Sequence, residues 1–173
     1  MTFYSELSET ERSDLFKELL KDHYIYPRHH GLKSDAAYRL IHLKNPSCGD
    51  DLSVQIHMDG ETISDICQEG EGCSICCASA SMMAELCTGL SKPEALEKIV
   101  EFKKMVSGKD YDEEGLAEAN ALQGVVKLPP RIKCATLAWI ALERLLNDEQ
   151  LRSLHLETED GEVFEAGKER GEK

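Results

Sequence analysis

The chain has 173 residues, of which 41% are hydrophobic and 31% charged, and its formal net charge is −13. This length suits one domain that buries a core without disulfide support, and no apolar run approaches the roughly 20 residues of a membrane-spanning helix. Nucleic-acid binding is not expected because phosphate contacts need clustered Lys and Arg. The polar, acidic residues 1–14 do not resemble a signal peptide, so we expect a cytoplasmic protein that binds neither nucleic acid nor membrane.

The first half of the chain predicts one helix followed by three strands. Apolar residues at helical spacing cover Glu9–Tyr24, with Ser8 as the start of a capping box and Pro27 as the end signal. Alternating apolar and polar residues then predict half-buried strands, with a hairpin turn at Asp59-Gly60. The strands are expected at residues 37–43, 52–58 and 62–68.

The second half predicts a layer of helices. Small apolar residues over Ile75–Leu86 favour a helix that packs closely on the sheet, and a second helix runs from Ser91 to about Val106. Residues 109–126 predict a short helix between loops, and Leu128-Pro129-Pro130 opens a last helix that ends near Asn147. The predicted fold class is α+β: a three-stranded antiparallel sheet packed against about five helices, in a single domain at 1–147.

Residues 148–173 differ in composition from the rest of the chain. They include nine acidic and four basic residues with few apolar ones. Such a segment buries too little apolar surface to offset the entropy of ordering it. We therefore expect an acidic, flexible tail.

Seven cysteines in a chain expected in the cytoplasm argue against a disulfide framework. Cys67 and Cys87 are interpreted as buried and inert. Cys76 and Cys77 lie three and four residues after Cys73 and are interpreted as small core residues, with alternative ligands or sulfur stores as the other interpretation. The six histidines show no metal-ligand spacing.

The remaining thiols predict a metal site. Cys48-Gly49-Asp50 places a thiol and a carboxylate two residues apart, Cys73 follows Gly70-Glu71-Gly72, and Cys134 lies near the start of the last helix. Zinc takes four ligands of these types, and helix N-termini stabilise thiolates. We predict that Cys48, Asp50, Cys73 and Cys134 bind one Zn²⁺, with a purely structural zinc or no metal as the alternatives.

Two cationic residues flank the last of these thiols. Arg131 and Lys133 precede Cys134 in the same turn, where a positive charge offsets the charge of a site built from anionic ligands. We expect Arg131 to act at the site, although solvated side chains at a helix start are the alternative.

Three motifs, in order, resemble the IscU/NifU-type iron–sulfur cluster assembly proteins. They cover most of the chain, from about Leu15 to Leu146, and imply a SufE/NifU-like fold. The motifs are Asn45-Pro46-Ser47-Cys48-Gly49-Asp50, Gly70-Glu71-Gly72-Cys73-Ser74 and Leu128-Pro129-Pro130-Arg131-Ile132-Lys133-Cys134.

Three departures from IscU point to the SufU branch of this family. Lys133 stands where IscU has His, and Arg131 follows the two prolines where IscU has Val. In addition, the stretch between Cys73 and Cys134 is longer than in IscU, with the excess around residues 106–126.

The resemblance implies a zinc-bound sulfur acceptor in iron–sulfur cluster assembly, with Cys48, Asp50, Cys73 and Cys134 as ligands. Cys48 would take sulfur from the persulfide of a PLP-dependent, SufS-type cysteine desulfurase, and Arg131 would steady the released thiolate. In that branch the partner donates a His to the zinc; other Suf scaffold components are further expected partners. The alternative is a scaffold that holds a transient 2Fe–2S or 4Fe–4S cluster, and a structural zinc module is a third interpretation.

Overall fold

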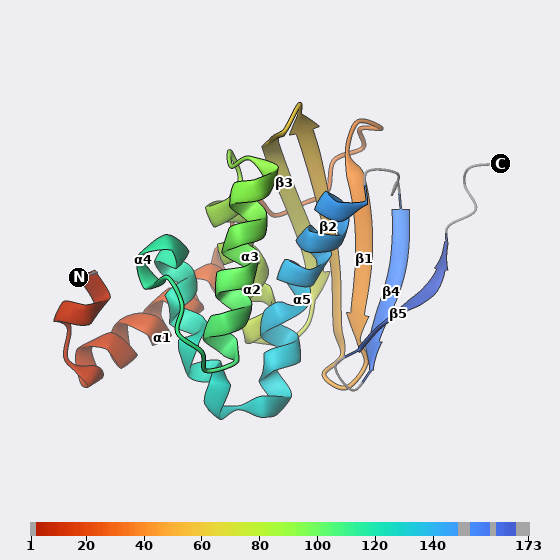
Figure 1. Ribbon diagram of the computed structural model, residues 1–173. Coiled ribbons are helices and arrows are strands. Elements are labelled where there is room, and N and C mark those ends of the chain that lie inside the picture. The colour runs from red at the N-terminus through yellow and green to blue at the C-terminus, as the bar shows by residue number, and fades with distance from the viewer. Residues whose placement is uncertain (1–2, 149–152, 160–161, 169–173) are drawn as a thin grey trace.

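The computed structural model describes residues 3–148, 153–159 and 162–168, with side chains described in 3–148. The helices lie together against one face of a twisted sheet (Figure 1). The helical elements are η1 (Phe3–Glu6), α1 (Glu9–Ile25), α2 (Ser74–Cys87), α3 (Lys92–Val106), α4 (Glu113–Leu116), η2 (Ala117–Lys127) and α5 (Pro129–Asn147). The strands are β1 (Arg39–Asn45), β2 (Asp50–Asp59), β3 (Thr62–Glu71), β4 (Ser153–Glu159) and β5 (Glu162–Lys168).

The predicted three-stranded antiparallel meander is confirmed. β1 pairs with β2 and β2 with β3, both antiparallel, and the Asp59-Gly60 turn joins the latter pair, with Gly60 at a φ of 61°. Alternation places Leu52, Val54 and Ile56 in the core, as period-two spacing requires.

The sheet also contains two strands that the sequence pattern did not predict. The order is β3-β2-β1-β4-β5, with β4 parallel to β1 and β5 antiparallel to β4. Both lie in the segment expected to be a tail. Despite their polar composition, β4 pairs with the free edge of β1 and β5 pairs with β4. Residues 149–152, 160–161 and 169–173 of that segment lie outside the described residues.

The predicted layer of helices is also confirmed. α2 contacts β3, α5 contacts β1 and β2, and α1 and α3 pack outside them. The small residues of α2 are buried, as expected for close packing on the sheet. The largest side chain of the core, Trp139 of α5, stacks on Phe102 of α3 with ring centroids 4.0 Å apart. Within the described residues no helix is long and apolar enough to cross a membrane.

The segment between α3 and α5 consists of the short α4 followed by η2, a 3-10 segment of 11 residues. Runs of this length are uncommon because 3-10 hydrogen bonds have poor geometry, and buried polar contacts support this one. The ring of His23 in α1 contacts Ser81 Oγ at 2.8 Å and Glu118 Oε2 at 2.5 Å. The Asn120 side-chain amide donates to the carbonyls of Glu113 and Ala117, each at 2.7 Å.

Three segments that are distant in sequence meet at one end of this fold. The loop between β1 and β2 approaches the start of α5, where the Cys48 thiol lies 3.9 Å from the Pro130 carbonyl oxygen. The start of α2 reaches the same loop through the backbone N–H of Cys73, which donates to Asp50. The fold thus gathers all three sequence motifs.

Candidate metal centre

A tight hairpin loop presents the first two candidate ligands. Asn45 and Asp50 form the last register pair of β1 and β2, so only four residues connect them. The Cys48 N–H donates to the Asn45 carbonyl at 3.2 Å, and Gly49 has a φ of 70°, which a residue with a Cβ adopts only with strain. This turn holds the Cys48 thiol half-buried above the Asp50 carboxylate, which is 2% exposed.

Three of the four predicted ligands offer atoms that all lie within 4.8 Å of one another: Cys48, Asp50 and Cys134. In a tetrahedral site, two sulfurs that are each about 2.3 Å from zinc lie about 3.8 Å apart. Ligand atoms within 4.8 Å of one another therefore need to move by only about 1 Å at most to bind one ion.

Cys73 adjoins this group but is not one of the three. Its backbone N–H donates to Asp50 Oδ1 at 3.0 Å, and its thiol lies near enough to Cys134 to help raise the pKa of that thiol. As the N-cap of α2, Cys73 uses no side-chain bond to cap the helix, so its sulfur remains available for a ligand role.

The negative charges that the thiols and the Asp50 carboxylate carry when ionised favour a bound cation. Cys134 has no exposed surface, and burial raises its pKa, as do its hydrogen bonds to Asp50, Cys48 and Cys73 in that order. These groups repel one another when ionised, because thiolates and a carboxylate are brought into one partly desolvated place. A donor set of three thiols and one carboxylate, so placed, fits a divalent metal ion.

Arg131 supplies positive charge at the rim of the group. Its side chain hydrogen-bonds to Cys134, and that bond is the largest cause of a raised Arg131 pKa, followed by the negative charge of Cys73. The guanidinium is exposed, so it reaches the thiols from the solvent side.

The other thiols are placed differently. Cys67, Cys76 and Cys87 are buried, and burial raises the pKa of Cys87 to about 12, which suits an inert core thiol. Cys77 is half-buried, and burial followed by the charge of Cys73 raises its pKa. Among the described residues, no histidine belongs to a group of three or more candidate ligands.

The sequence interpretation missed two residues that shape the site. The buried side-chain amide of Asn45 donates to Asp50 Oδ2 at 3.3 Å and to Cys134 Sγ at 3.7 Å. A Cβ on Gly72 would lie 2.4 Å from Asp50 Oδ1, so only glycine lets the strand pass this carboxylate. The Asn-Pro pair before Cys48 was a visible signal, but the contacts depend on the β1–β2 register.

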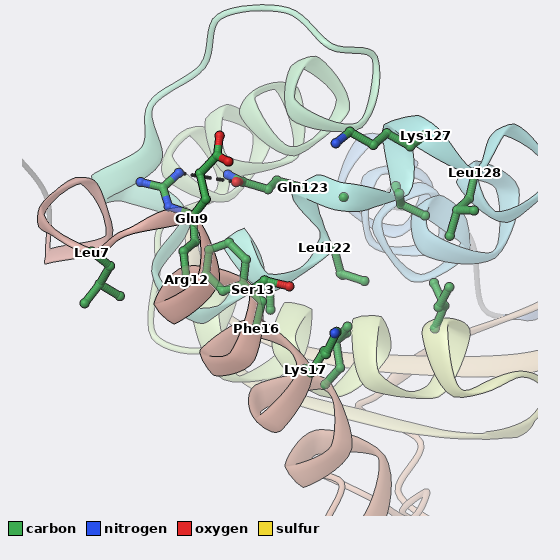
Figure 2. A pocket seen from close by; sticks show the side chains of 15 residues that line it. Leu7, Glu9, Arg12, Ser13, Phe16, Lys17, Leu122, Gln123, Lys127 and Leu128 are labelled. Atoms are coloured by element: carbon green, nitrogen blue, oxygen red, sulfur yellow. Dashed lines mark hydrogen bonds between the residues drawn. The ribbon is translucent and has the colours of Figure 1, made fainter.

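An apolar groove of about 750 Å³ lies beside the centre, between α1 and η2 (Figure 2). Phe16 of α1 and Leu122 of η2 face it, and Lys17 and Lys127 stand at its rim. Its lining includes Leu128, which directly precedes the prolines of the site and is 51% exposed. The groove therefore adjoins the segment that opens α5 and carries Cys134.

Comparison with known proteins gives a consistent set of relatives. The family model described as "NifU-like N terminal domain" matches residues 15–150. The zinc-dependent sulfurtransferase SufU of Bacillus subtilis is 44% identical over 131 residues, which cover 75% of this chain and 88% of that protein. The iron–sulfur cluster assembly scaffold protein IscU of Streptococcus pyogenes is 41% identical over 133 residues, covering 76% and 82%.

Solved structures share the fold. FiSufU of Fervidobacterium islandicum AW-1, described as an iron–sulfur cluster assembly scaffold candidate of the SUF system, matches with a TM-score of 0.67 and 32% identity, over 84% of this chain and 99% of that one. The N-terminal part of a NifU-like protein from Brucella abortus, at 18% identity, matches with a TM-score of 0.68 over 78% and 94% of the two chains.

Proposed function

This chain belongs to the NifU-like N-terminal domain family, with SufU and IscU proteins as relatives, and on that premise we propose that it is a sulfur acceptor in iron–sulfur cluster assembly. Its acceptor is Cys48, and its donor is the persulfide of a PLP-dependent, SufS-type cysteine desulfurase. A zinc ion held by Cys48, Asp50, Cys73 and Cys134 is its resident metal. The B. subtilis relative is named as a zinc-dependent sulfurtransferase, which supports the sulfur-transfer role and the choice of zinc.

The observation that carries the proposal is the unequal placement of the clustered thiols. Cys134 is fully buried in α5, whereas Cys48 is half-buried in a hairpin loop. A thiol on a short loop can turn toward a docked partner, but a thiol within a packed helix cannot. Cys48 is therefore better placed than Cys134 to leave the site and react, and Cys73, although also half-buried, is held at the start of α2.

The metal, when bound, holds the thiols deprotonated at neutral pH, as thiolate ligands must be. Asp50 completes the donor set with a harder and more exchangeable ligand than sulfur. The buried Cys134 stays in place, and Arg131 stabilises negative charge at the rim of the site.

The transfer itself follows thiol–disulfide chemistry. The Cys48 thiolate attacks the terminal sulfur of the donor's persulfide, forming a new S–S bond at Cys48. The S–S bond of the donor breaks, and its cysteine leaves as a thiolate that can react again. No external oxidant or reductant is consumed, because sulfane sulfur moves from one thiol to the other.

Persulfide mapping tests this proposal. The zinc-loaded protein is incubated with a SufS-type desulfurase and cysteine, then alkylated and analysed by mass spectrometry. We expect persulfide on Cys48, and in Cys48→Ala a return of desulfurase turnover to its unstimulated rate. Cys77→Ala is the matched control, since Cys77 is also a half-buried free thiol near the site, and it should keep full stimulation. Full stimulation by Cys48→Ala would overturn the acceptor assignment.

A scaffold role is the second candidate, favoured by the IscU scaffold protein among the relatives and by thiol ligands of the kind that hold iron–sulfur clusters. In that case the cluster is a cargo assembled at the same residues. Metal analysis of anaerobically purified protein separates the two. The acceptor role predicts about one zinc per chain and little iron, since a tetrahedral site holds one ion; iron with acid-labile sulfide would favour the scaffold.

A further inference from the structure

Asn45 ends β1 with a side chain that has no exposed surface. Its Nδ2 lies 3.3 Å from Asp50 Oδ2 and 3.7 Å from Cys134 Sγ. Both neighbours are candidate ligands that become anionic when they bind a metal. The two N–H groups of one buried amide are thus directed at two members of the donor set.

The orientation of this amide is fixed by its other end. Ser47 Oγ donates to Asn45 Oδ1 at 2.7 Å, so the oxygen faces the loop and the nitrogen faces the ligands. The reverse orientation would place the amide oxygen against a carboxylate oxygen. Since Ser47 directly precedes Cys48, Ser47 connects the β1–β2 loop to the buried Asn45 side chain.

A second buried asparagine shows what a purely structural role looks like. Asn120 is equally inaccessible, but its amide donates to two backbone carbonyls, those of Glu113 and Ala117. It satisfies main-chain groups of the α4–η2 segment. The Asn45 amide instead donates to the side chains of two candidate metal ligands, Asp50 and Cys134.

Hydrogen bonds from N–H groups offset part of the negative charge of a buried thiolate and fix the position of its sulfur, and such partners orient and tune metal ligands. Cys134 receives one from Asn45 and one from Arg131. In the described part of the chain, Cys48 Sγ receives none from an N–H and instead donates to the Pro130 carbonyl at 3.9 Å. Of the three sulfurs of the site, those of Cys134 and Cys48 are therefore supported unequally.

We propose that Asn45 is a positioning residue that holds Cys134 and Asp50 as fixed ligands and leaves Cys48 as the ligand that departs. The inference rests on the proposed zinc-bound acceptor, and it assigns the order in which ligands are released. Asn45 does not contact the transferred sulfur. It acts through the two ligands to which it donates.

Cobalt substitution tests this directly, because sulfur-to-cobalt charge-transfer bands report electron density on the sulfurs. In Asn45→Ala we expect these bands to move to longer wavelength, as a thiolate that loses a hydrogen bond becomes a stronger electron donor. Withdrawal of zinc by a chromophoric chelator should be roughly 10-fold to 100-fold easier, the usual effect of losing such a partner. Asn120→Ala is the matched control, and it should lower thermal stability without moving the bands.

If Asn45→Ala does not fold, Asn45→Leu provides the same test, because it roughly keeps the size of the side chain and removes its N–H donors without adding a charge or a ligand. Unchanged bands in a folded Asn45 variant would overturn the inference. Neither the cobalt bands nor the withdrawal of zinc involves desulfurase. If the wild type failed to take up sulfur on Cys48, persulfide mapping would show this separately, and the test of Asn45 would still stand.

Discussion

The backbone N–H of Cys73 donates a hydrogen bond to Asp50 Oδ1 at 3.0 Å. This bond connects the N-terminus of α2 to the β1–β2 hairpin across 23 residues of sequence. The other oxygen of Asp50 accepts from Asn45, so the carboxylate is held from both sides. Its close approach to the end of β3 depends on Gly72, where a Cβ would also lie 3.1 Å from the Asp50 Cα.

Gly72→Ala should therefore damage the site more than the fold. The methyl group must displace Asp50 or the start of α2, and either movement breaks the Cys73–Asp50 bond. We expect zinc affinity to fall roughly 10-fold or more, measured by competition with a chromophoric chelator.

Gly124→Ala is the control for this substitution. Nothing lies within 4 Å of a Cβ at Gly124, and its φ is not in the left-handed region. Zinc affinity should be unchanged there. If Gly72→Ala bound zinc as tightly as the wild type, the fixed position of Asp50 would not matter for binding.

Removal of Arg131 should weaken zinc binding by a similar factor at every pH between 6.5 and 9. The guanidinium hydrogen-bonds to Cys134, and loss of this cation raises further a Cys134 pKa that burial has already raised. Zinc must displace the thiol proton, so Arg131→Ala should bind more weakly at pH 7, by roughly threefold to tenfold for an exposed charge. The deficit should stay nearly constant between pH 6.5 and 9, because burial keeps the Cys134 pKa above this range in both proteins.

Chelator competition between pH 6.5 and 9 measures this effect. Arg131→Lys keeps the charge and should recover much of the affinity, although its single ammonium does not reproduce the geometry of the guanidinium. Equal zinc affinities for the wild type and Arg131→Ala across this range would show that this cation does not act on the thiols.

Leu128→Glu tests whether the groove beside the site takes part in partner docking. Leu128 is 51% exposed at the mouth of the groove, so the change should leave the fold intact. We expect the desulfurase concentration that gives half-maximal sulfur transfer to rise about 10-fold, as for loss of one apolar anchor, with the maximal rate retained.

Val100→Glu is the matched control for the groove. Val100 is 48% exposed on α3 and does not line the groove. Equal effects of the two substitutions would indicate a general response to added negative charge. The groove would then have no specific part in docking the desulfurase.

Much of the fold follows from local sequence patterns. Period-two spacing identified β2, and the residues that form capping boxes, Ser8 with Glu11 and Ser91 with Glu94, mark the starts of α1 and α3. These signals act within one element, so they are readable without the tertiary structure. The β4–β5 pair was missed because its polar composition resembles a tail and its partner is the distant strand β1.

The candidate site was predictable in its thiols but not in its supporting residues. Cys48, Cys73 and Cys134 follow from motifs that resemble a known family, and spacing alone does not bring them together. The contacts of Asn45 require the exact hairpin register and a helix 89 residues away. His23 showed no ligand spacing, and its burial against Glu118 depends on how η2 packs on α1.

Alkaline pH should destabilise the metal-free protein in part through Cys87. Burial raises the pKa of this thiol from 9.0 to about 12, with a small opposing effect of Lys98. A raised folded-state pKa contributes stability that is fully present below pH 9 and is lost as pH rises toward 12. At pH 10 the loss is about 1.4 kcal/mol, since each pKa unit corresponds to about 1.36 kcal/mol.

Urea unfolding of the metal-free wild type and of Cys87→Ala, at pH 7.5, 9 and 10, isolates this contribution, because all other thiols are shared. The alanine variant should be the less stable of the two at pH 7.5, since it lacks a buried sulfur. The difference between the two free energies of unfolding should narrow by about 1.4 kcal/mol by pH 10. A constant difference across this range would mean that Cys87 titrates alike in the folded and unfolded chains, in conflict with its complete burial at the end of α2.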